Sequence, residues 1–274
     1  MIDMLSMIDA PCSLEGSILK FIQTKLNADC SFDGIGNLIA HKKGNGKKIM
    51  FYTSVDEDSF IVLTRDKRKI NFAHKGDKKL NKGDLLSFNG YLAVADDDKS
   101  CTLLKEYDIN TSDVGCFYAP AYEDDDIILA KEAASKLAIS AMCQASEENS
   151  DFDVYFVFGI NSKMRNIGLA ASVNSIAPDE LIVFEETEKD TEKLCIKFLT
   201  KGFSSNRELA EKLIDKYELE IIINSEDNSA GSVANCEKSA VIGIPVENKE
   251  LSRQKTNTKL KDNILNLIKG ELQW

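Results

Sequence analysis

The feature that most constrains the fold is an alternation of continuous apolar runs with amphipathic segments. Apolar runs predict buried strands at 49–53, 154–158, 180–184, 219–223 and 240–244. Helical spacing predicts helices at 130–144, 167–175, 206–216 and 256–269. A strand that is apolar along its whole length can be buried on both faces, which is typical of parallel sheets covered by helices. The sequence therefore predicts an α/β fold with a mostly parallel central sheet flanked by helices.

The pattern changes between residues 59 and 126. Short strands, such as 60–63 and 85–88, alternate there with Gly, Asn, Asp and Lys turns, and no long amphipathic segment interrupts them. We expect residues 59–126 to form a small all-β domain inserted into an α/β domain made of residues 1–58 and 127–274. His74 is expected in a loop of this insertion, and residues 42–48 are expected to form a hairpin turn.

Charge and cysteine content exclude several classes of protein. Asp and Glu outnumber Lys and Arg by 45 to 34, which gives a formal charge of -11 and argues against nucleic acid or an anionic membrane as the partner. No apolar run is long enough to span a bilayer, and residues 1–4 do not begin a leader pattern. The 7 cysteines are scattered singly, without CxxC spacing. We expect a reduced, cytoplasmic protein.

Common catalytic motifs are missing from the sequence. There is no G-x-S-x-G elbow, and His41 and His74 are the only histidines, neither of them in a catalytic context. The glycines at 34 and 36 lack the third glycine of a nucleotide-binding loop and precede a strand rather than a helix. Nothing adds a paired-carboxylate signal for glycoside hydrolysis. These motifs alone leave the function open.

Six collinear segments nevertheless carry a resemblance. They are 33–40 (DGIGNLIA), 50–62 (MFYTSVDEDSFIV), 127–145, 154–170, 177–179 and 241–250. In this order they resemble the dinuclear-zinc aminopeptidases grouped with glutamyl aminopeptidase and endoglucanase M. The resemblance implies an aminopeptidase-like fold whose β insertion serves dimerisation, a homo-oligomer that is a dimer or larger, and peptides as partners. Members of that family use two zinc or cobalt ions to remove N-terminal residues.

The family's metal ligands and general base fall on unsuitable residues in this chain. Relative to the family pattern, a ligand His falls at Ser54, the bridging Asp at Ala134, the general base at Ser162, a ligand Glu at Lys163, a ligand Asp at Glu185 and the last ligand His at Glu250. The family's GGTDA loop corresponds to residues 230–234. Alanine cannot bridge metals, and serine has no carboxylate to activate water. We therefore expect no catalytic residue, no metal and no cofactor.

The residues that remain predict a remnant pocket. It would be formed by Asp56, Glu57, Lys163, Glu185 and Glu250, with the ammonium of Lys163 replacing the charge of zinc. Two alternatives stay open for these side chains: simple solvation in an open cleft, or an all-oxygen site for Mg, Mn or Ca.

Two functions remain under consideration. The first is a non-catalytic homologue that binds peptides or a partner protein, or that regulates an active paralogue. The second is a divergent metal-dependent aminopeptidase with an altered metal site.

Overall fold

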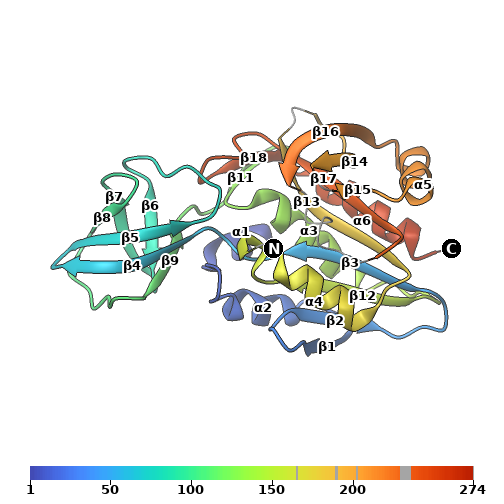
Figure 1. Cartoon of the computed structure of the whole chain (residues 1–274), viewed down its shortest axis with the longest axis horizontal. Helices are drawn as coiled ribbons and strands as arrows, with labels where there is room; N and C mark the ends of the chain where they lie inside the picture. Colours follow the sequence, from blue (N-terminus) through green and yellow to red (C-terminus); the bar gives the residue numbers. More distant parts are fainter. Residues whose placement is uncertain (165, 189–190, 202, 229–235, 274) are drawn as a thin grey trace.

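The computed structural model describes residues 1–164, 166–188, 191–201, 203–228 and 236–273. Figure 1 shows an elongated molecule with a larger body of sheet and helices and a small group of strands at one end. The N-terminus lies near the middle of this view, and the C-terminus lies at the end of the body away from the small group of strands.

The larger body is built around a sheet that has nine strands in the described part of the chain. Its order is β1-β2-β12-β3-β13-β17-β14-β15, with β16 paired to β14. The strands are β1 Asp29–Phe32, β2 Leu38–Lys42, β3 Lys48–Ser54, β12 Asp153–Gly159, β13 Glu180–Glu188, β14 Cys195–Lys201, β15 Phe203–Ser204, β16 Glu220–Asn228 and β17 Ser239–Val246.

The sheet is mixed, so the prediction of a mostly parallel sheet is not confirmed. β12, β3, β13 and β17 form a parallel centre. On one side β2 runs antiparallel to β12, and on the other β14 runs antiparallel to β17. The prediction rested on apolar runs, which report burial on both faces but not strand direction.

Residues 42–48 do not close a hairpin, so that prediction is wrong. Strand β12 lies between β2 and β3 and pairs with both, so that Val157 faces Ile39 on one side and Tyr52 on the other. Local turn residues cannot reveal that a strand more than a hundred positions later inserts between two neighbours in sequence.

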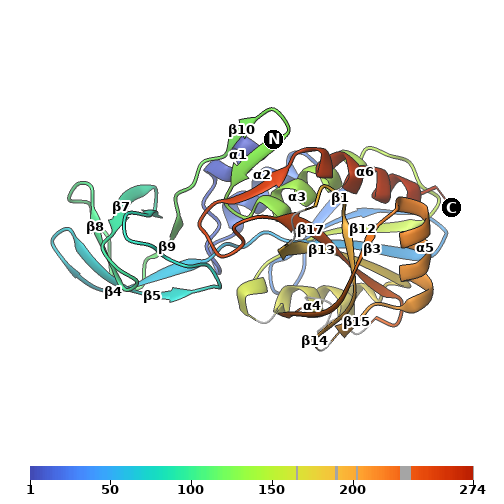
Figure 2. The same cartoon turned by 90° about the horizontal axis from the view of Figure 1, so that it is seen from above.

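Side chains of the central strands alternate between two apolar layers. Phe51, Phe156 and Phe184 pack with helices α2, α3, α5 and α6, whereas Met50 and Tyr52 pack with α4 on the other face. Figure 2 shows α3 and α6 on one side of the sheet and α4 on the opposite side. The helices are α1 Ile2–Met7, α2 Gly16–Gln23, α3 Ala133–Ala145, α4 Ile167–Ile176, α5 Arg207–Tyr217 and α6 Lys259–Glu271.

The small group of strands is a closed barrel with its own core. The barrel order is β4-β5-β8-β7-β6-β9, and Phe60 packs edge-to-face on Phe117 inside it with ring centroids 4.9 Å apart. The strands are β4 Ser59–Asp66, β5 Lys69–Lys75, β6 Leu85–Phe88, β7 Tyr91–Ala95, β8 Ser100–Leu103 and β9 Val114–Phe117. The barrel falls within the segment expected to be all-β. Its treatment as a separate domain with boundaries at 59 and 126 stays a prediction.

His74 lies in strand β5 rather than in a loop, so the loop prediction is wrong. Its ring stacks on Phe60, with centroids 4.6 Å apart. A histidine flanked by Ala73 and Lys75 gives little strand signal by itself; its strand conformation comes from pairing with β4.

A three-stranded sheet lies near the start of α3. It consists of β10 Tyr122–Asp124, β11 Ile127–Ala130 and β18 Gln254–Asn257, in the order β10-β11-β18. Gln254 accepts a hydrogen bond of 2.8 Å from the backbone N–H of Ala133, so this sheet holds the first turn of α3.

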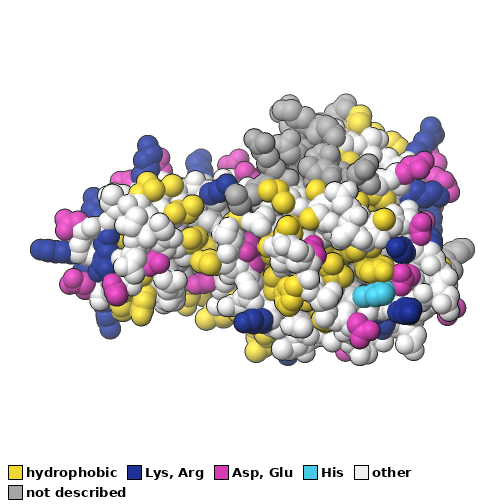
Figure 3. Space-filling model, turned by 60° about the horizontal axis from the view of Figure 1, so that its bottom comes forward, with side chains coloured by type: hydrophobic (Ala, Val, Ile, Leu, Met, Phe, Trp, Pro, Cys, Tyr) yellow, Lys and Arg dark blue, Asp and Glu magenta, His cyan; other side chains and the backbone are white. Residues whose placement is uncertain are grey.

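Acidic and basic side chains are interspersed on the barrel end of the face shown in Figure 3, while apolar side chains are visible over the middle of that face. Among the helices that the structure describes, none has the length and apolar character needed to cross a bilayer.

Candidate functional site

A cavity of about 600 Å³ opens at the carboxyl ends of the central parallel strands. Ser54 is the last residue of β3, Glu185 and Glu186 lie in the second half of β13, and the short helix η1 (Ser162–Met164) follows β12. Ligands of α/β folds bind at this end of a sheet because the loops that follow parallel strands converge there. The cavity is therefore the candidate functional site.

Five of the residues predicted for the site line this cavity. They are Ser54, Ser162, Lys163, Glu185 and Glu250. Three others, Asp56, Glu57 and Ala134, are buried nearby but do not line it. The segment at 230–234, matched to the family's GGTDA loop, lies outside the described residues.

Lys163 is the centre of a buried charge network. Its Nζ lies 3.4 Å from Asp58 Oδ1 and 3.7 Å from Glu132 Oε1. Burial works to lower the pKa of Lys163, but the carboxylates of Glu132 and Asp58 outweigh this and raise the pKa well above its ordinary value. The side chain therefore stays an ammonium ion.

Lys78 supplies a second ammonium group to the same network. Its Nζ lies 3.3 Å from Glu132 Oε1 and 3.8 Å from Glu186 Oε2. Burial would raise the pKa of Glu132, but the charges of Lys163 and Lys78 outweigh it and the pKa is lowered. Glu132 is thus an ionised carboxylate that shares one oxygen between two cations.

Asp58 is enclosed by donors from the barrel and from η1. Its Oδ2 lies 3.1 Å from Nε2 of His74 and accepts a hydrogen bond of 2.8 Å from the backbone N–H of Lys78. Burial would raise the pKa of Asp58, but the hydrogen bond with His74 and the charge of Lys163 lower it to about 2. A Cβ at Gly76, whose φ is +143°, would lie only 2.0 Å from Asp58 Cγ, so glycine is required for this approach.

Asp56 orients the loop that carries Lys163. Its carboxylate accepts bonds from the Ser162 N–H at 3.1 Å, the Ser162 hydroxyl at 2.5 Å and the Lys163 N–H at 3.0 Å. Burial raises the pKa of Asp56, and these hydrogen bonds only partly offset it. Asp56, which was predicted to belong to the remnant pocket, therefore holds η1 in place and does not line the cavity.

Glu57 belongs to a different cluster. It lies 2.8 Å from Nζ of Lys131 and 3.1 Å from Nζ of Lys136, both of them buried. Neighbouring residues of the segment after β3 thus point their carboxylates to different places, and Glu57 does not join the cavity.

Ala134 lies in α3 and packs in the main apolar core. Two positions earlier, Glu132 precedes α3 with a left-handed φ of 47° and lines the cavity. At the start of α3, the carboxylate that lines the cavity therefore belongs to Glu132. The comparison with the family pattern assigned no role to Glu132.

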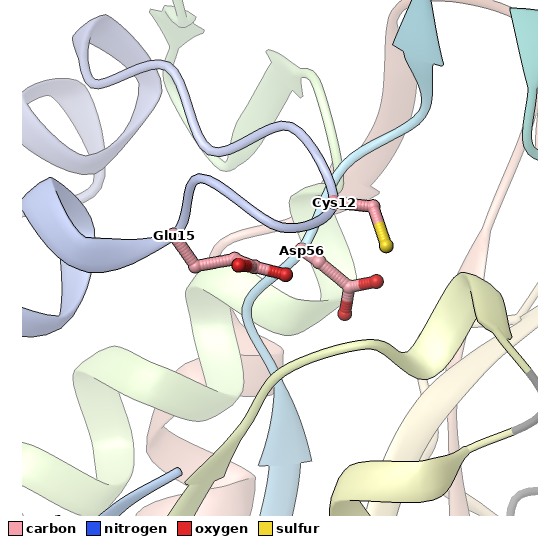
Figure 4. A group of neighbouring side chains, drawn as sticks. All are labelled: Cys12, Glu15 and Asp56. Carbon is pink, nitrogen blue, oxygen red and sulfur yellow. The ribbon is translucent and has the colours of Figure 1, made fainter. Parts of the chain in front are cut away.

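Two further carboxylates of the cavity, those of Glu185 and Glu186, also have nitrogen partners. Glu185 lies 2.7 Å from Nζ of Lys197, and Glu186 accepts a hydrogen bond from Gln254. The ligand atoms of Asp56, Glu185 and Glu250 do not lie close enough together to share a metal ion. Among the described residues, the group of three His, Cys, Asp or Glu residues whose ligand atoms lie within 4.8 Å of one another is Cys12, Glu15 and Asp56 (Figure 4). This placement does not favour the all-oxygen metal site.

Sequence comparison missed Asp58, Lys78, Glu132 and Glu186. Asp58 and Glu186 directly follow residues that were singled out, so the acidic pairs at 57–58 and 185–186 were the available signal. The sequence gave no such signal for Lys78, because Lys78 lies in the β-rich segment. Only the folded structure brings it to Glu132 at the start of α3.

The fold is similar to those of solved structures described as aminopeptidases and an endoglucanase. Aminopeptidase APDkam598 of Desulfurococcus kamchatkensis superposes with a TM-score of 0.87 at 16% identity, over 99% of this chain and 93% of that one. The TET1 peptidase of Pyrococcus horikoshii gives 0.87 at 14% identity, over 99% and 98%. An endoglucanase of Thermotoga maritima gives 0.83 at 18% identity, over 100% and 96%. At these identities the likeness establishes the fold.

Sequence similarity points in the same direction. A protein of Acetivibrio thermocellus described as "Putative aminopeptidase" is 29% identical in an alignment of 180 residues, and the match covers 57% of this chain and 54% of that protein. The match thus spans about half the length of the curated relative. No protein-family model matches the chain.

Proposed function

We propose that this chain is a degenerate member of the two-zinc aminopeptidase family that has lost the peptidase centre and acts as a non-catalytic protein that binds peptides or a partner. The fold likeness and the 29% identity to an aminopeptidase relative support the family. The residues at the family's ligand positions do not fit two zinc ions, since Ser54, Ala134 and Lys163 offer neither imidazole nor carboxylate.

The observation that carries the proposal is the position of two ammonium groups around one carboxylate oxygen. Glu132 Oε1 lies 3.3 Å from Nζ of Lys78 and 3.7 Å from Nζ of Lys163. A carboxylate between two fixed cations resembles, in charge, a carboxylate that bridges two metal ions. Protein cations then satisfy the buried carboxylates, and a dication entering the cavity would be repelled.

The cavity retains the means to bind a peptide. Glu188 and Glu250 are exposed carboxylates at its border, and a peptide N-terminus carries the complementary ammonium charge. The alternative, a divergent metal-dependent aminopeptidase, would have to displace Lys78 or Lys163 from the carboxylates before a metal could bind.

Peptide hydrolysis and peptide binding can be tested together. The full chain is incubated with a pool of short unblocked peptides and zinc, cobalt or manganese, and the release of amino acids is measured. We expect no release of amino acids above the protein-free blank. We also expect fluorescent peptides with free N-termini to bind with micromolar affinity and N-acetylated peptides not to bind.

Two outcomes contradict the proposal. Metal-dependent release that is lost in Glu132→Gln but kept in the exposed control Glu123→Gln would establish a catalytic cavity. Equal binding of free and acetylated peptides, or no binding, would remove the peptide-binding part.

A further inference from the structure

Tyr52 belongs to the lining of the candidate cavity and carries a buried hydroxyl without a partner. The residue is 1% exposed, and its hydroxyl forms no hydrogen bond within the described part of the chain. Buried tyrosine hydroxyls usually have a partner, because an unpaired one loses its hydrogen bonds with water. Burial, followed by the charges of Asp56 and Asp33, raises the pKa of Tyr52, so the hydroxyl keeps its proton. It is a hydrogen-bond donor without an acceptor.

The Tyr52 hydroxyl lies at the carboxyl end of the central strands. A Cβ at Gly159 would lie 2.0 Å from the hydroxyl oxygen, so glycine at this position leaves room for it. Gly159 ends β12 and is the register partner of Ser54, which ends β3. The tyrosine therefore brings its hydroxyl to the edge of the sheet at which the cavity opens.

Two serine hydroxyls of the cavity also have no protein partner. Ser54 and Ser135 line the cavity and are partly exposed, and the side chain of neither forms a hydrogen bond with another residue of the described ranges. Ser162 differs, since its hydroxyl donates to Asp56. Hydroxyl groups that can all donate are suited to an oxygen atom with several lone pairs.

Helices α3 and α4 both begin at the cavity. Ser135 lies in the first turn of α3 and Asn166 directly precedes α4, and both residues line the cavity. In α4 the backbone N–H of Ala170 is the first to reach back to the carbonyl of Asn166, so the N–H groups of 167–169 have no acceptor within the helix. The N-terminus of a helix carries a partial positive charge and favours an anionic group.

The charged residues of the cavity are divided between its border and its interior. The exposed ones, Asp77, Glu188 and Glu250, are all acidic. The partly or fully buried ones are Glu132, Glu185, Glu186, Lys78, Lys163, Lys197 and Lys249. Asp58 contacts Lys163 from behind the lining and balances the interior charges. The border is therefore negative, whereas the interior has no excess of negative charge.

We propose that the cavity binds short unblocked peptides by both ends, with the peptide α-carboxylate held by the hydroxyls of Tyr52, Ser54 and Ser135 near the first turn of α4. This inference rests on the proposed function, which places the peptide ammonium group at Glu188 and Glu250. A carboxylate accepts about four hydrogen bonds, so it can pair with all three hydroxyls. The Tyr52 hydroxyl is buried, and the peptide reaches it after a small movement of the lining side chains.

The size of the cavity limits the length of such a peptide. Both ends of the peptide lie within a space of about 600 Å³. An extended chain adds about 3.5 Å for each residue. Peptides of two or three residues are therefore the ligands, and longer peptides leave the carboxylate site unused.

The test is calorimetric titration of the full chain with neutral peptides of two or three residues in unblocked, C-amidated and N-acetylated forms. We expect amidation to weaken binding about ten-fold or more, the scale of a hydrogen bond to a charged group. Tyr52→Phe and Ser135→Ala should each reduce this discrimination about three-fold or more. The control Tyr155→Phe should bind as the parent chain does, because the Tyr155 hydroxyl bonds to Asp153 at the start of β12, away from the cavity.

Thermal unfolding separates a binding role of the Tyr52 hydroxyl from a structural one. Because the hydroxyl has no partner in the protein alone, Tyr52→Phe should melt at the temperature of the parent chain or above it. The rise in melting temperature that an unblocked dipeptide gives should be smaller in Tyr52→Phe than in the parent chain. A lower melting temperature of Tyr52→Phe without peptide, with an unchanged rise, would assign the hydroxyl to the fold and overturn the site.

The remaining outcomes also decide the question. Equal binding of amidated and unblocked peptides, with acetylated peptides excluded, would overturn the carboxylate site and leave the proposed function intact. Tight binding of amidated peptides that contain Asp or Glu would assign the site to a side-chain carboxylate instead. Unchanged discrimination in Tyr52→Phe and Ser135→Ala would place the carboxylate elsewhere, and Ser135→Ala alone decides if Tyr52→Phe does not fold. Absence of binding by every peptide would contradict both this site and the peptide-binding part of the proposed function.

Discussion

Lys78 and Glu132 join the barrel end of the molecule to helix α3, with Nζ 3.3 Å from Oε1 and both side chains buried. Lys78 follows strand β5 of the barrel, and Glu132 precedes α3 of the main body. The same carboxylate oxygen faces Lys163 from η1. One glutamate therefore links three segments that are far apart in the sequence, and the charge network supports the arrangement of the cavity as well as its chemistry.

Lys163→Met should destabilise the chain by about 3–5 kcal/mol, because it leaves Asp58 and Glu132 as buried carboxylates with too few cations. Urea unfolding at neutral pH measures the change. The control is Lys193→Met, whose ion pair with Glu218 is exposed and should contribute less than about 1 kcal/mol. Equal stabilities of Lys163→Met and the parent chain would mean that the carboxylates are solvated, as in an open cleft.

Gly76→Ala should destabilise the chain more than Gly83→Ala. Both glycines have positive φ, +143° and +96°, so alanine is strained at either position. A Cβ at Gly83 meets nothing within 4 Å, whereas a Cβ at Gly76 collides with the carboxylate of Asp58. We expect an extra loss of about 1–3 kcal/mol for Gly76→Ala in thermal or urea unfolding. Equal losses would show that Asp58 can move away freely.

The sequence predicted the positions of the central strands better than the directions in which they run. Apolar runs such as 49–53 mark strands buried on both faces, and the structure has β3 there. The antiparallel pairing of β2 with β12 could not be predicted in the same way, because the burial pattern is the same for either direction. The barrel was visible as a change in pattern, since short alternating strands need only local turns.

The candidate site was predicted in part. Ser54 and Glu185 both line the cavity. Strand β3 ends at Ser54, next to the predicted strand 49–53, whereas β13 continues past the predicted end at 184 to Glu188. The partners of Lys163 were not predicted. Asp58 and Glu132 lie one position from Glu57 and two positions from Ala134, the residues that the sequence analysis singled out. The left-handed backbone conformation of Glu132, directly before α3, decides which side chain enters the cavity. Sequence spacing does not reveal this conformation.

The contribution of Asp58 to stability should depend on pH. Its folded pKa of about 2 is below the ordinary 3.8, so the stabilisation is complete above about pH 4 and is lost as the pH falls toward 2. The depression corresponds to about 2 kcal/mol. The gap in unfolding free energy between the parent chain and Asp58→Asn should therefore narrow over this range. Asp108→Asn, whose side chain is exposed, should show no such trend; a constant gap for Asp58→Asn would contradict the prediction.

The chain should form a homo-oligomer. The TET1 peptidase with the same fold assembles into a tetrahedron or an octahedral shell, and the resemblance assigns dimerisation to the barrel. We propose a dimer or larger assembly and expect light scattering to give at least twice the chain mass of 30.4 kDa at micromolar concentration. A mass equal to one chain across the accessible concentration range would contradict it.

The two lysines that share Glu57 should differ in their effect on stability. For Lys131, burial is outweighed by the charge of Glu57 and the pKa is raised, so the folded state favours its charged form. For Lys136, burial wins over the same carboxylate and the pKa is lowered, so its charge opposes folding. Lys131→Met should therefore cost at least about 1 kcal/mol more than Lys136→Met in urea unfolding at neutral pH. In a Glu57→Gln background the shared anion is gone, and the excess cost of Lys131→Met should shrink to the part that Asp9, whose Oδ1 lies 3.3 Å from Lys131 Nζ, supplies. Equal costs in the parent background, or an excess that is undiminished without Glu57, would show that the carboxylate of Glu57 does not discriminate between the two ammonium groups.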